Sequence, residues 1–186
     1  MNSERIRKLT YAALFLGVAM VLPFITGQIP EIGAMLSPMH IPVLLCGFMC
    51  GWPWGMAVGF IAPLLRSVTF DMPKLFPTAV AMAFELTVYG GMTGIMYRLL
   101  PHRKWTIYAS LLIAMIAGRI VWGVAQVVLA GLAHFEFTWA IFITKAVVEA
   151  IPGIIMHIVL IPIIVMAMER AGLSLNEPIS RKEKKV

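Results

Sequence analysis

Polar side chains recur inside long apolar segments of this chain, where they could bind a small polar solute. The stretch GRIVWGVAQ carries Arg119, Trp122 and Gln126 at spacings i, i+3 and i+7, which place all three on one helix face. Arginine binds a carboxylate through two parallel hydrogen bonds, and tryptophan offers a flat surface for stacking. This stripe predicts a binding surface for a small molecule.

Four more charged residues lie in similar apolar surroundings, namely Arg66, Glu85, Lys145 and Glu149. A charged side chain inside a membrane costs roughly 2.5–3.5 kcal/mol on insertion scales, so such residues usually face the protein interior and pair. With Arg119 the set holds three cations and two anions, and the surplus cation favours an anionic group on the ligand. We expect these residues, which come from four helices, to line one outward-facing pocket.

Alternative roles apply to some of these candidates. Lys145 and Glu149 are spaced i, i+4, so they could equally pair with each other and only hold helices together. His40 is a weaker substrate-binding candidate, because a capping or loop role would explain it as well. His157 is expected to lie deeper than the rest.

Catalytic motifs are missing from the sequence. It contains no GxxxxGK[ST] for ATP binding, no HExxH and no GxSxG. Cys46 and Cys50 lie four apart in an apolar run, which is typical of packing thiols rather than metal ligands. We therefore predict no catalytic residue, no metal site and no cofactor bound by this chain.

The elements that position these residues must be membrane helices. The chain has 186 residues, of which 60% are hydrophobic and 13% charged, and its mean hydropathy is +0.89. A soluble domain averages roughly 45–50% apolar and about 25% charged residues. The composition predicts an all-α integral membrane protein.

Proline, glycine and charge clusters divide the chain into six candidate transmembrane helices. Their expected ranges are 8–26, 39–51, 53–69, 76–100, 105–132 and 138–169, in one transmembrane domain over 1–186 with a basic cytoplasmic tail at 171–186. Pro63 and Pro152 should kink helices or mark their ends. Six helices would put both termini on one side.

The basic residues predict that this side is the cytoplasm. With the N-terminus inside, the cytoplasmic segments hold eleven of the 15 Lys and Arg residues, and the external loops hold only Lys74. The eleven are Arg5, Arg7, Lys8, Arg98, Arg103, Lys104, Arg170, Arg181, Lys182, Lys184 and Lys185. This positive-inside pattern accounts for the net charge of +6 without a nucleic-acid partner.

Small residues four apart predict close helix contacts. In lipid, such residues let two helices approach closely. Ala13 and Gly17, with Ala12 beside them, predict a docking face on the first helix. The same spacing in Gly55-xxx-Gly59 and Gly90-xxx-Gly94 is expected to pack helices inside the chain.

The chain resembles the S component, the substrate-binding membrane subunit, of energy-coupling factor (ECF) vitamin transporters. The basic N-terminus, the small residues of the first helix, six helices with both ends inside and a long first external loop carry this resemblance. It extends over nearly the whole chain and includes the segment MHIPVLLCGFMCGWPWGMAVGFIAPLLRS, with PMHIP and PLLRS, and the motifs GRIVWG and AIPGI.

The resemblance implies an S-component bundle in the bacterial cytoplasmic membrane, with a high-affinity vitamin pocket open to the outside. Loops 27–38 and 70–77, the latter with Asp71 and Lys74, would roof it. The first helix would dock on an ECF transmembrane subunit, and two cytoplasmic ATPases would drive toppling of the S component in the membrane. The docking alanines of the family fall here on Ala13 and Gly17, so the second position departs from the pattern.

The surplus positive charge favours an anionic substrate such as pantothenate. Pyridoxine and hydroxymethylpyrimidine are alternatives, because Glu85 or Glu149 could bind a ring nitrogen or a hydroxyl group. A structural membrane protein, a carrier that works alone and a membrane enzyme compete with the transporter interpretation. The convergent charges argue against a structural protein, and the missing internal repeats argue against a carrier that works alone. The missing catalytic groups argue against an enzyme.

Overall fold

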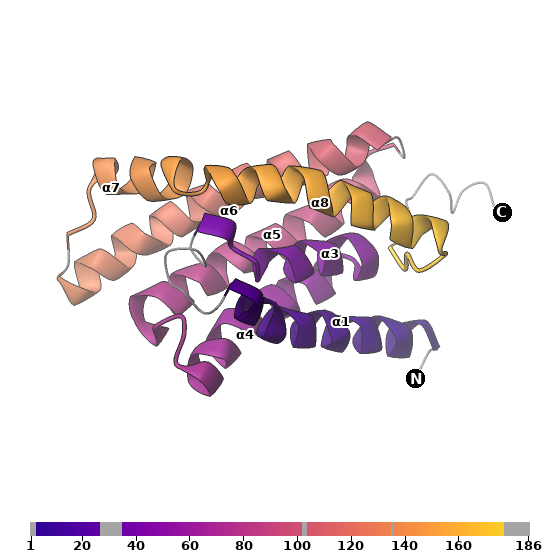
Figure 1. Cartoon of the computed structure of the whole chain (residues 1–186), viewed down its shortest axis with the longest axis horizontal. Coiled ribbons are helices and arrows are strands. Elements are labelled where there is room, and N and C mark those ends of the chain that lie inside the picture. The colour runs from indigo at the N-terminus through magenta and orange to yellow at the C-terminus, as the bar shows by residue number, and fades with distance from the viewer. Residues whose placement is uncertain (1–2, 27–34, 102–103, 135, 177–186) are drawn as a thin grey trace.

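The computed structural model describes residues 3–26, 35–101, 104–134 and 136–176, which form an elongated bundle of helices (Figure 1). In chain order these are α1 (Ser3–Val21), the 3-10 helix η1 (Leu22–Thr26), α3 (His40–Cys50), α4 (Trp52–Phe70), the π-helix η2 (Leu75–Ala79), α5 (Val80–Leu99), α6 (Lys104–Ala133), α7 (Trp139–Ile143), the π-helix η3 (Thr144–Val148) and α8 (Ile151–Arg170). Over these residues the chain contains no strand, as its composition predicts.

Four helical runs are long and apolar enough to cross a membrane. They are Ser3–Ile25, Leu75–Leu99, Lys104–Leu132 and Trp139–Arg170, and the shorter His40–Cys50 is also apolar. Each of the six ranges expected from the sequence contains one helical run. A transmembrane course for α3 and α4, and with it the count of six, stays a prediction.

Helix α3 begins inside the bundle. Its eleven residues span about 16 Å, roughly half of a 30 Å hydrocarbon core. It ends at Cys50, and the next residue, Gly51, makes a tight turn with φ +92° that leads directly into α4. The Ser3 end of α1 and the Arg170 end of α8 lie at this same end of the bundle (Figure 1). His40, at the opposite end of α3, therefore lies about half-way along the bundle.

Glycines bring α3, α4 and α5 into backbone contact. A Cβ atom added at Gly55 would lie 2.4 Å from the carbonyl oxygen of Gly90, and one added at Gly59 would lie 2.2 Å from that of Leu86. At Gly94 an added Cβ would lie 2.3 Å from the backbone nitrogen of Trp52. The small-residue pairs on α4 and α5 thus pack helices within the chain, as their spacing predicts.

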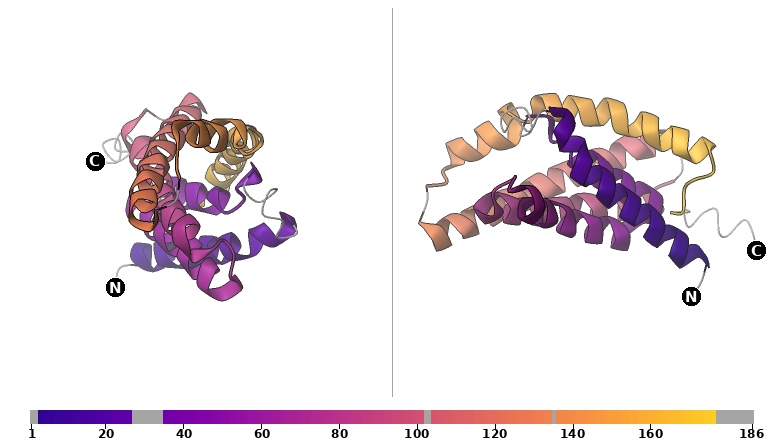
Figure 2. Two further views of the ribbon diagram at one scale, coloured as in Figure 1. Left: turned by 90° about the vertical axis from the view of Figure 1, so that its left-hand side faces the viewer. Right: turned by 60° about the horizontal axis from the view of Figure 1, so that its bottom comes forward.

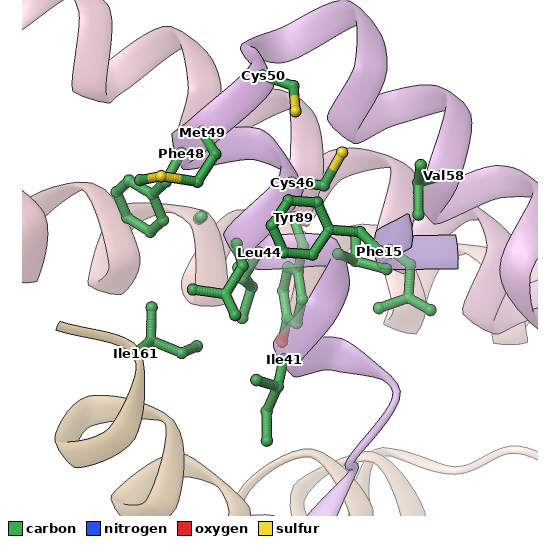
Figure 3. Close-up of a cluster of buried hydrophobic side chains, with 14 of the residues drawn as sticks. Phe15, Ile41, Leu44, Cys46, Phe48, Met49, Cys50, Val58, Tyr89 and Ile161 are labelled. Carbon is green, nitrogen blue, oxygen red and sulfur yellow. The ribbon is translucent and has the colours of Figure 1, made fainter. Parts of the chain in front are cut away.

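Every residue of α3 is buried, and its apolar side chains form the centre of the main hydrophobic cluster (Figure 3). Leu44 and Phe48 of α3 pack in this cluster with Tyr89 of α5 and Ile161 of α8. Cys46 and Cys50 are free thiols in the same cluster, as expected of packing cysteines.

The run of α7 and η3, which precedes α8, is more loosely attached. Helix α7 has no buried residue, and η3 has only Ala146. Figure 2 shows this run extending along one side of the bundle. Pro152 lies in the first turn of α8, which begins two residues after the π-helical η3, so it marks a helix start, whereas Pro63 lies inside α4.

Candidate functional site

Five polar side chains from four helices meet inside the bundle, and we call them the buried polar cluster. They are His40 of α3, Glu85 and Tyr89 of α5, Arg119 of α6 and His157 of α8. Except for Arg119, whose side chain is 21% exposed, all of them are buried. Polar groups of this kind inside a membrane protein mark a functional site by default.

Glu85 is the centre of the cluster. Its Oε1 atom lies 3.0 Å from Nη1 of Arg119, an ion pair between α5 and α6. Its Oε2 atom lies 3.7 Å from Nε2 of His40, which is too long for a hydrogen bond. Tyr89, one turn further along α5, faces the same carboxylate. One anion and one cation therefore balance each other here.

The two histidines extend the cluster towards α8. The rings of His40 and His157 stack with their centroids 6.0 Å apart and an angle of 26° between them. The ring of Tyr89 meets that of His40 edge-on, with centroids 5.3 Å apart. His40 is held in place because its backbone N–H donates to the carbonyl oxygen of Ser37, 3.0 Å away, in the turn that starts α3.

The glycines of GRIVWG make room for this arrangement. A Cβ atom added at Gly118 would lie 2.0 Å from the Tyr89 ring, and one added at Gly123 would lie 2.5 Å from the Phe142 ring. Gly118 thus lets α6 approach α5 closely enough for Arg119 to reach Glu85. The motif combines one charged residue with two glycines that admit aromatic neighbours.

Several nitrogen atoms of the cluster have no hydrogen-bond partner among the described residues. They are both ring nitrogens of His40, Nε of Arg119 and Nε2 of His157. About 90% or more of buried polar groups in proteins have a partner, and the exceptions need an explanation. The cluster therefore offers hydrogen-bonding capacity that the described residues do not use.

Trp122 and Gln126 continue the Arg119 stripe along α6. Both are buried, with 8% and 9% of their surface exposed. The Trp122 ring lies 5.9 Å from that of Phe137 and stacks on that of Phe142 at 6.2 Å. Trp122 thus packs between α6 and the segment around α7, one turn along α6 from Arg119.

Arg66 lies elsewhere in the fold. Its guanidinium carbon lies 4.9 Å from the ring centroid of Phe24 and 5.1 Å from that of Phe70, and its Nη1 donates to the carbonyl oxygen of Met20. The residue ties the end of α1 and η1 to the end of α4. The structure does not bring it to the buried polar cluster.

Lys145 and Glu149 are also separate from the cluster. Lys145 lies on η3 and Glu149 directly follows it, and both are exposed. Among the described residues neither makes an ion pair, either with the other or with the cluster. Of the three cations expected at one pocket, only Arg119 contacts Glu85.

A model of the family described as "ECF transporter, substrate-specific component" matches residues 7–165, most of the chain. The chain belongs to this family. It is accordingly a membrane transport component that binds substrate, and the family is not one of enzymes. No curated protein and no solved structure matches the chain.

The expected docking face of this S component is only partly accessible. Ala13 and Gly17 lie on the exposed side of α1, and a Cβ atom added at Gly17 would meet nothing within 4 Å. Ala12 is 5% exposed and packs into the hydrophobic core of the chain itself. A partner helix could therefore contact Ala13 and Gly17 but not Ala12.

The expected roof of the pocket is described only in part. Residues 27–34 of the first loop lie outside the described residues. The remainder of that loop lies against α8, since a Cβ atom added at Gly153 would lie 2.5 Å from the carbonyl oxygen of Met35. In the second loop Asp71 and Lys74 are exposed, and Asp71 has a left-handed backbone with φ +56°.

Sequence reasoning missed Tyr89 and left His157 out of the site. Tyr89 follows Glu85 by four residues, a spacing that puts both on one face of α5, and this signal was available. His157 was expected to lie deeper than the other groups, but it stacks on His40. The reason is that α3 begins half-way along the bundle, so His40 itself lies deep.

The described residues show no group suited to metal binding. No three His, Cys, Asp or Glu side chains in these parts of the chain lie close enough together to hold an ion. The cluster's chemistry in the described residues is hydrogen bonding, one ion pair and aromatic stacking. Such chemistry suits reversible binding of a small molecule.

Proposed function

We propose that the buried polar cluster is the vitamin-binding site of this S component. The observation that carries the proposal is the set of buried nitrogen atoms on His40, Arg119 and His157 without hydrogen-bond partners among the described residues. A ligand with several hydrogen-bonding groups would satisfy them, and a few convergent polar groups in apolar surroundings are typical of small-molecule sites.

The charge balance of the cluster favours an uncharged substrate. The expected preference for an anion depended on a surplus cation, but Arg66 packs against two phenylalanines and Lys145 is exposed. A carboxylate that bound Arg119 would lie beside Glu85, 3.0 Å from the same guanidinium group. Two carboxylates at one site repel each other strongly.

We therefore propose an uncharged, hydroxylated nitrogen heterocycle as the substrate, of the pyridoxine or hydroxymethylpyrimidine type. Its ring would stack against the aromatic side chains of the cluster, and its hydroxyl groups and ring nitrogen would bond to His40, Glu85 and His157. The rings of His40, Tyr89 and His157 already lie within stacking distance of one another.

Pantothenate is the second candidate. One observation favours it: Arg119 is 21% exposed, and its Nε atom has no partner among the described residues. The guanidinium group could thus bind a carboxylate while it keeps its contact with Glu85. This candidate requires that the anion approach Arg119 from the side away from Glu85.

We also propose that this protein delivers its substrate as other S components of the family do. The S component would dock through Ala13 and Gly17 on an ECF transmembrane subunit, and two cytoplasmic ATPases would drive its toppling in the membrane. The exposed small residues on α1 support this docking. Copurification with these subunits, lost in a Gly17→Leu variant, tests it.

The first experiment is native mass spectrometry of the purified protein, followed by thermal shift with pyridoxine, hydroxymethylpyrimidine and pantothenate. We expect a bound heterocycle and stabilisation by one of the first two. The Glu85→Gln variant should lose affinity by at least tenfold, since hydrogen bonds to charged groups contribute about 1.5–3 kcal/mol. Glu149→Gln, the same change on an exposed residue, should bind normally.

The outcomes separate the candidates. Stabilisation by pantothenate alone would replace the uncharged substrate by the anionic one. If Glu85→Gln and Glu149→Gln bound every tested vitamin as the wild type does, the buried polar cluster would not be the binding site.

A further inference from the structure

A second polar site lies at the end of the bundle that carries both ends of the described chain. It is a cavity of about 400 Å³, within the range of roughly 300–1,000 Å³ that small-molecule sites occupy. Its lining comes from α1, from the last turn of α5 and from the segment after α8: Glu4, Arg7, Lys8, Arg98, Gly172, Ser174, Leu175 and Asn176. None of these residues belongs to the buried polar cluster.

The cavity carries positive charge that the described residues leave uncompensated. Lys8 Nζ lies 2.7 Å from Glu4 Oε1, so these two residues neutralise each other. Arg7 and Arg98 line the same cavity from α1 and α5 and make no ion pair within the described part of the chain. Two guanidinium groups beside one cavity suit a phosphate group, which arginine binds through paired hydrogen bonds.

The wall of the cavity is fixed to the rigid part of the bundle. The backbone N–H of Leu175 donates to the carbonyl oxygen of Met49, 2.9 Å away. Asn176 is buried, and its Nδ2 donates to the carbonyl oxygens of Gly94 at 3.2 Å and Gly47 at 3.5 Å. The segment after α8 is thereby held against α3 and α5, so this wall of the cavity is fixed in the fold.

Exposed apolar residues lie on α1 next to lining residues in the sequence. Ile6 and Leu9 are 44% and 51% exposed, and they flank Arg7 and Lys8 in the sequence. A ligand with a phosphate group and hydrocarbon chains could place the phosphate between the arginines and the chains along this face. Basic pockets at the cytoplasmic side of membrane proteins bind such lipid head groups.

We propose that this cavity binds the phosphate group of an anionic phospholipid, with Arg7 and Arg98 as its ligands. The bound head group bridges α1 to the end of α5 at the predicted cytoplasmic surface. The site is independent of the vitamin site, because it shares no residue with the buried polar cluster.

The test uses the full chain, delipidated in detergent and titrated with dioleoylphosphatidylglycerol or dioleoylphosphatidylethanolamine under native mass spectrometry. The wild type should prefer phosphatidylglycerol. Arg7→Gln/Arg98→Gln should lose about 25-fold in affinity for it, about fivefold for each arginine. Arg5→Gln, an exposed arginine on α1 outside the cavity, is the matched control and should bind as the wild type does.

Three results would overturn the proposal. Equal phosphatidylglycerol affinity in the wild type and the double variant would exclude the cavity as the site. An equal loss in Arg5→Gln would show only general surface attraction. Stabilisation by inorganic phosphate alone, lost in the double variant, would assign the site to a soluble phosphate compound instead of a lipid.

Two further measurements keep the test decisive. Melting temperatures check that the variants fold, as expected for exposed arginines. Vitamin binding should be unchanged in the double variant, so failure of the lipid proposal is distinguishable from failure of the proposed function.

Discussion

The two ends of the bundle are packed in contrasting ways. Towards the end that carries both ends of the described chain, α3, α4 and α5 touch through glycines, and a Cβ atom added at Gly90 would lie 2.2 Å from the carbonyl oxygen of Gly55. At the other end α7 has no buried residue, and a Cβ atom added at Gly131 of α6 would meet nothing within 4 Å. The first region is a close-packed scaffold and the second is loosely attached.

The contrast explains where the buried polar cluster lies. In lipid no hydrophobic driving force holds helices together, so close contact between small residues supplies much of the stability. Regions with few buried contacts open at lower free-energy cost. The cluster lies between the scaffold and the loosely attached region, with Glu85 and His40 on the scaffold and His157 on α8. Binding can thus combine a carboxylate of the scaffold with a histidine of the helix that follows the loosely attached α7 and η3.

The largest expected effect on stability comes from adding a methyl group to a glycine of the scaffold. Gly90→Ala would push the α4 and α5 backbones apart, so we expect a loss of about 3 kcal/mol or more in stability. Gly131→Ala makes the same change where space is free and should be neutral or slightly stabilising. Thermal unfolding in detergent measures both. Equal melting temperatures would remove the distinction between the two regions.

The ion pair between Glu85 and Arg119, at the boundary of the two regions, should give the next largest effect on stability. Glu85→Gln leaves the Arg119 charge without its partner, so we expect a loss of about 3 kcal/mol in stability. Adding Arg119→Gln should recover part of this stability without restoring vitamin binding. Independent, additive losses in the double variant would show that the two side chains do not act as a pair.

Arg66 tests the outer attachment of α1. Arg66→Met removes two cation–π contacts and one hydrogen bond, so we expect about 1–2 kcal/mol of lost stability with unchanged vitamin affinity. Lys74→Met, on an exposed lysine in the neighbouring loop, is the control and should have no effect. A tenfold loss of vitamin affinity in Arg66→Met alone would mean that Arg66 belongs to the binding site.

The smallest effect is expected in the loosely attached run. Lys145→Gln should change stability by less than about 1 kcal/mol, because the side chain is exposed and has no ion-pair partner in the described residues. Vitamin affinity should also stay constant. A clear loss of affinity, measured by isothermal titration, would mean that η3 moves towards the cluster when the ligand binds.

Particular residues show how far sequence reasoning reaches. Apolar runs bounded by proline, glycine and charge predicted where the helical runs lie, because the bilayer imposes length and composition on each helix separately. The glycine spacings on α4 and α5 predicted internal contacts for the same local reason. Arg119 and Glu85 were found as candidates because a buried charge stands out in an apolar segment.

The sequence alone therefore determined the class of protein, its helices and the charged residues that need a partner inside the membrane. The tertiary structure decided which partner each of these side chains contacts. Arg66 lies against Phe24 and Phe70, and His40 meets His157 because α3 starts half-way along the bundle. These choices depend on how far each helix is shifted along its neighbours and on the face it turns towards them. Periodicity within one helix carries no information about either.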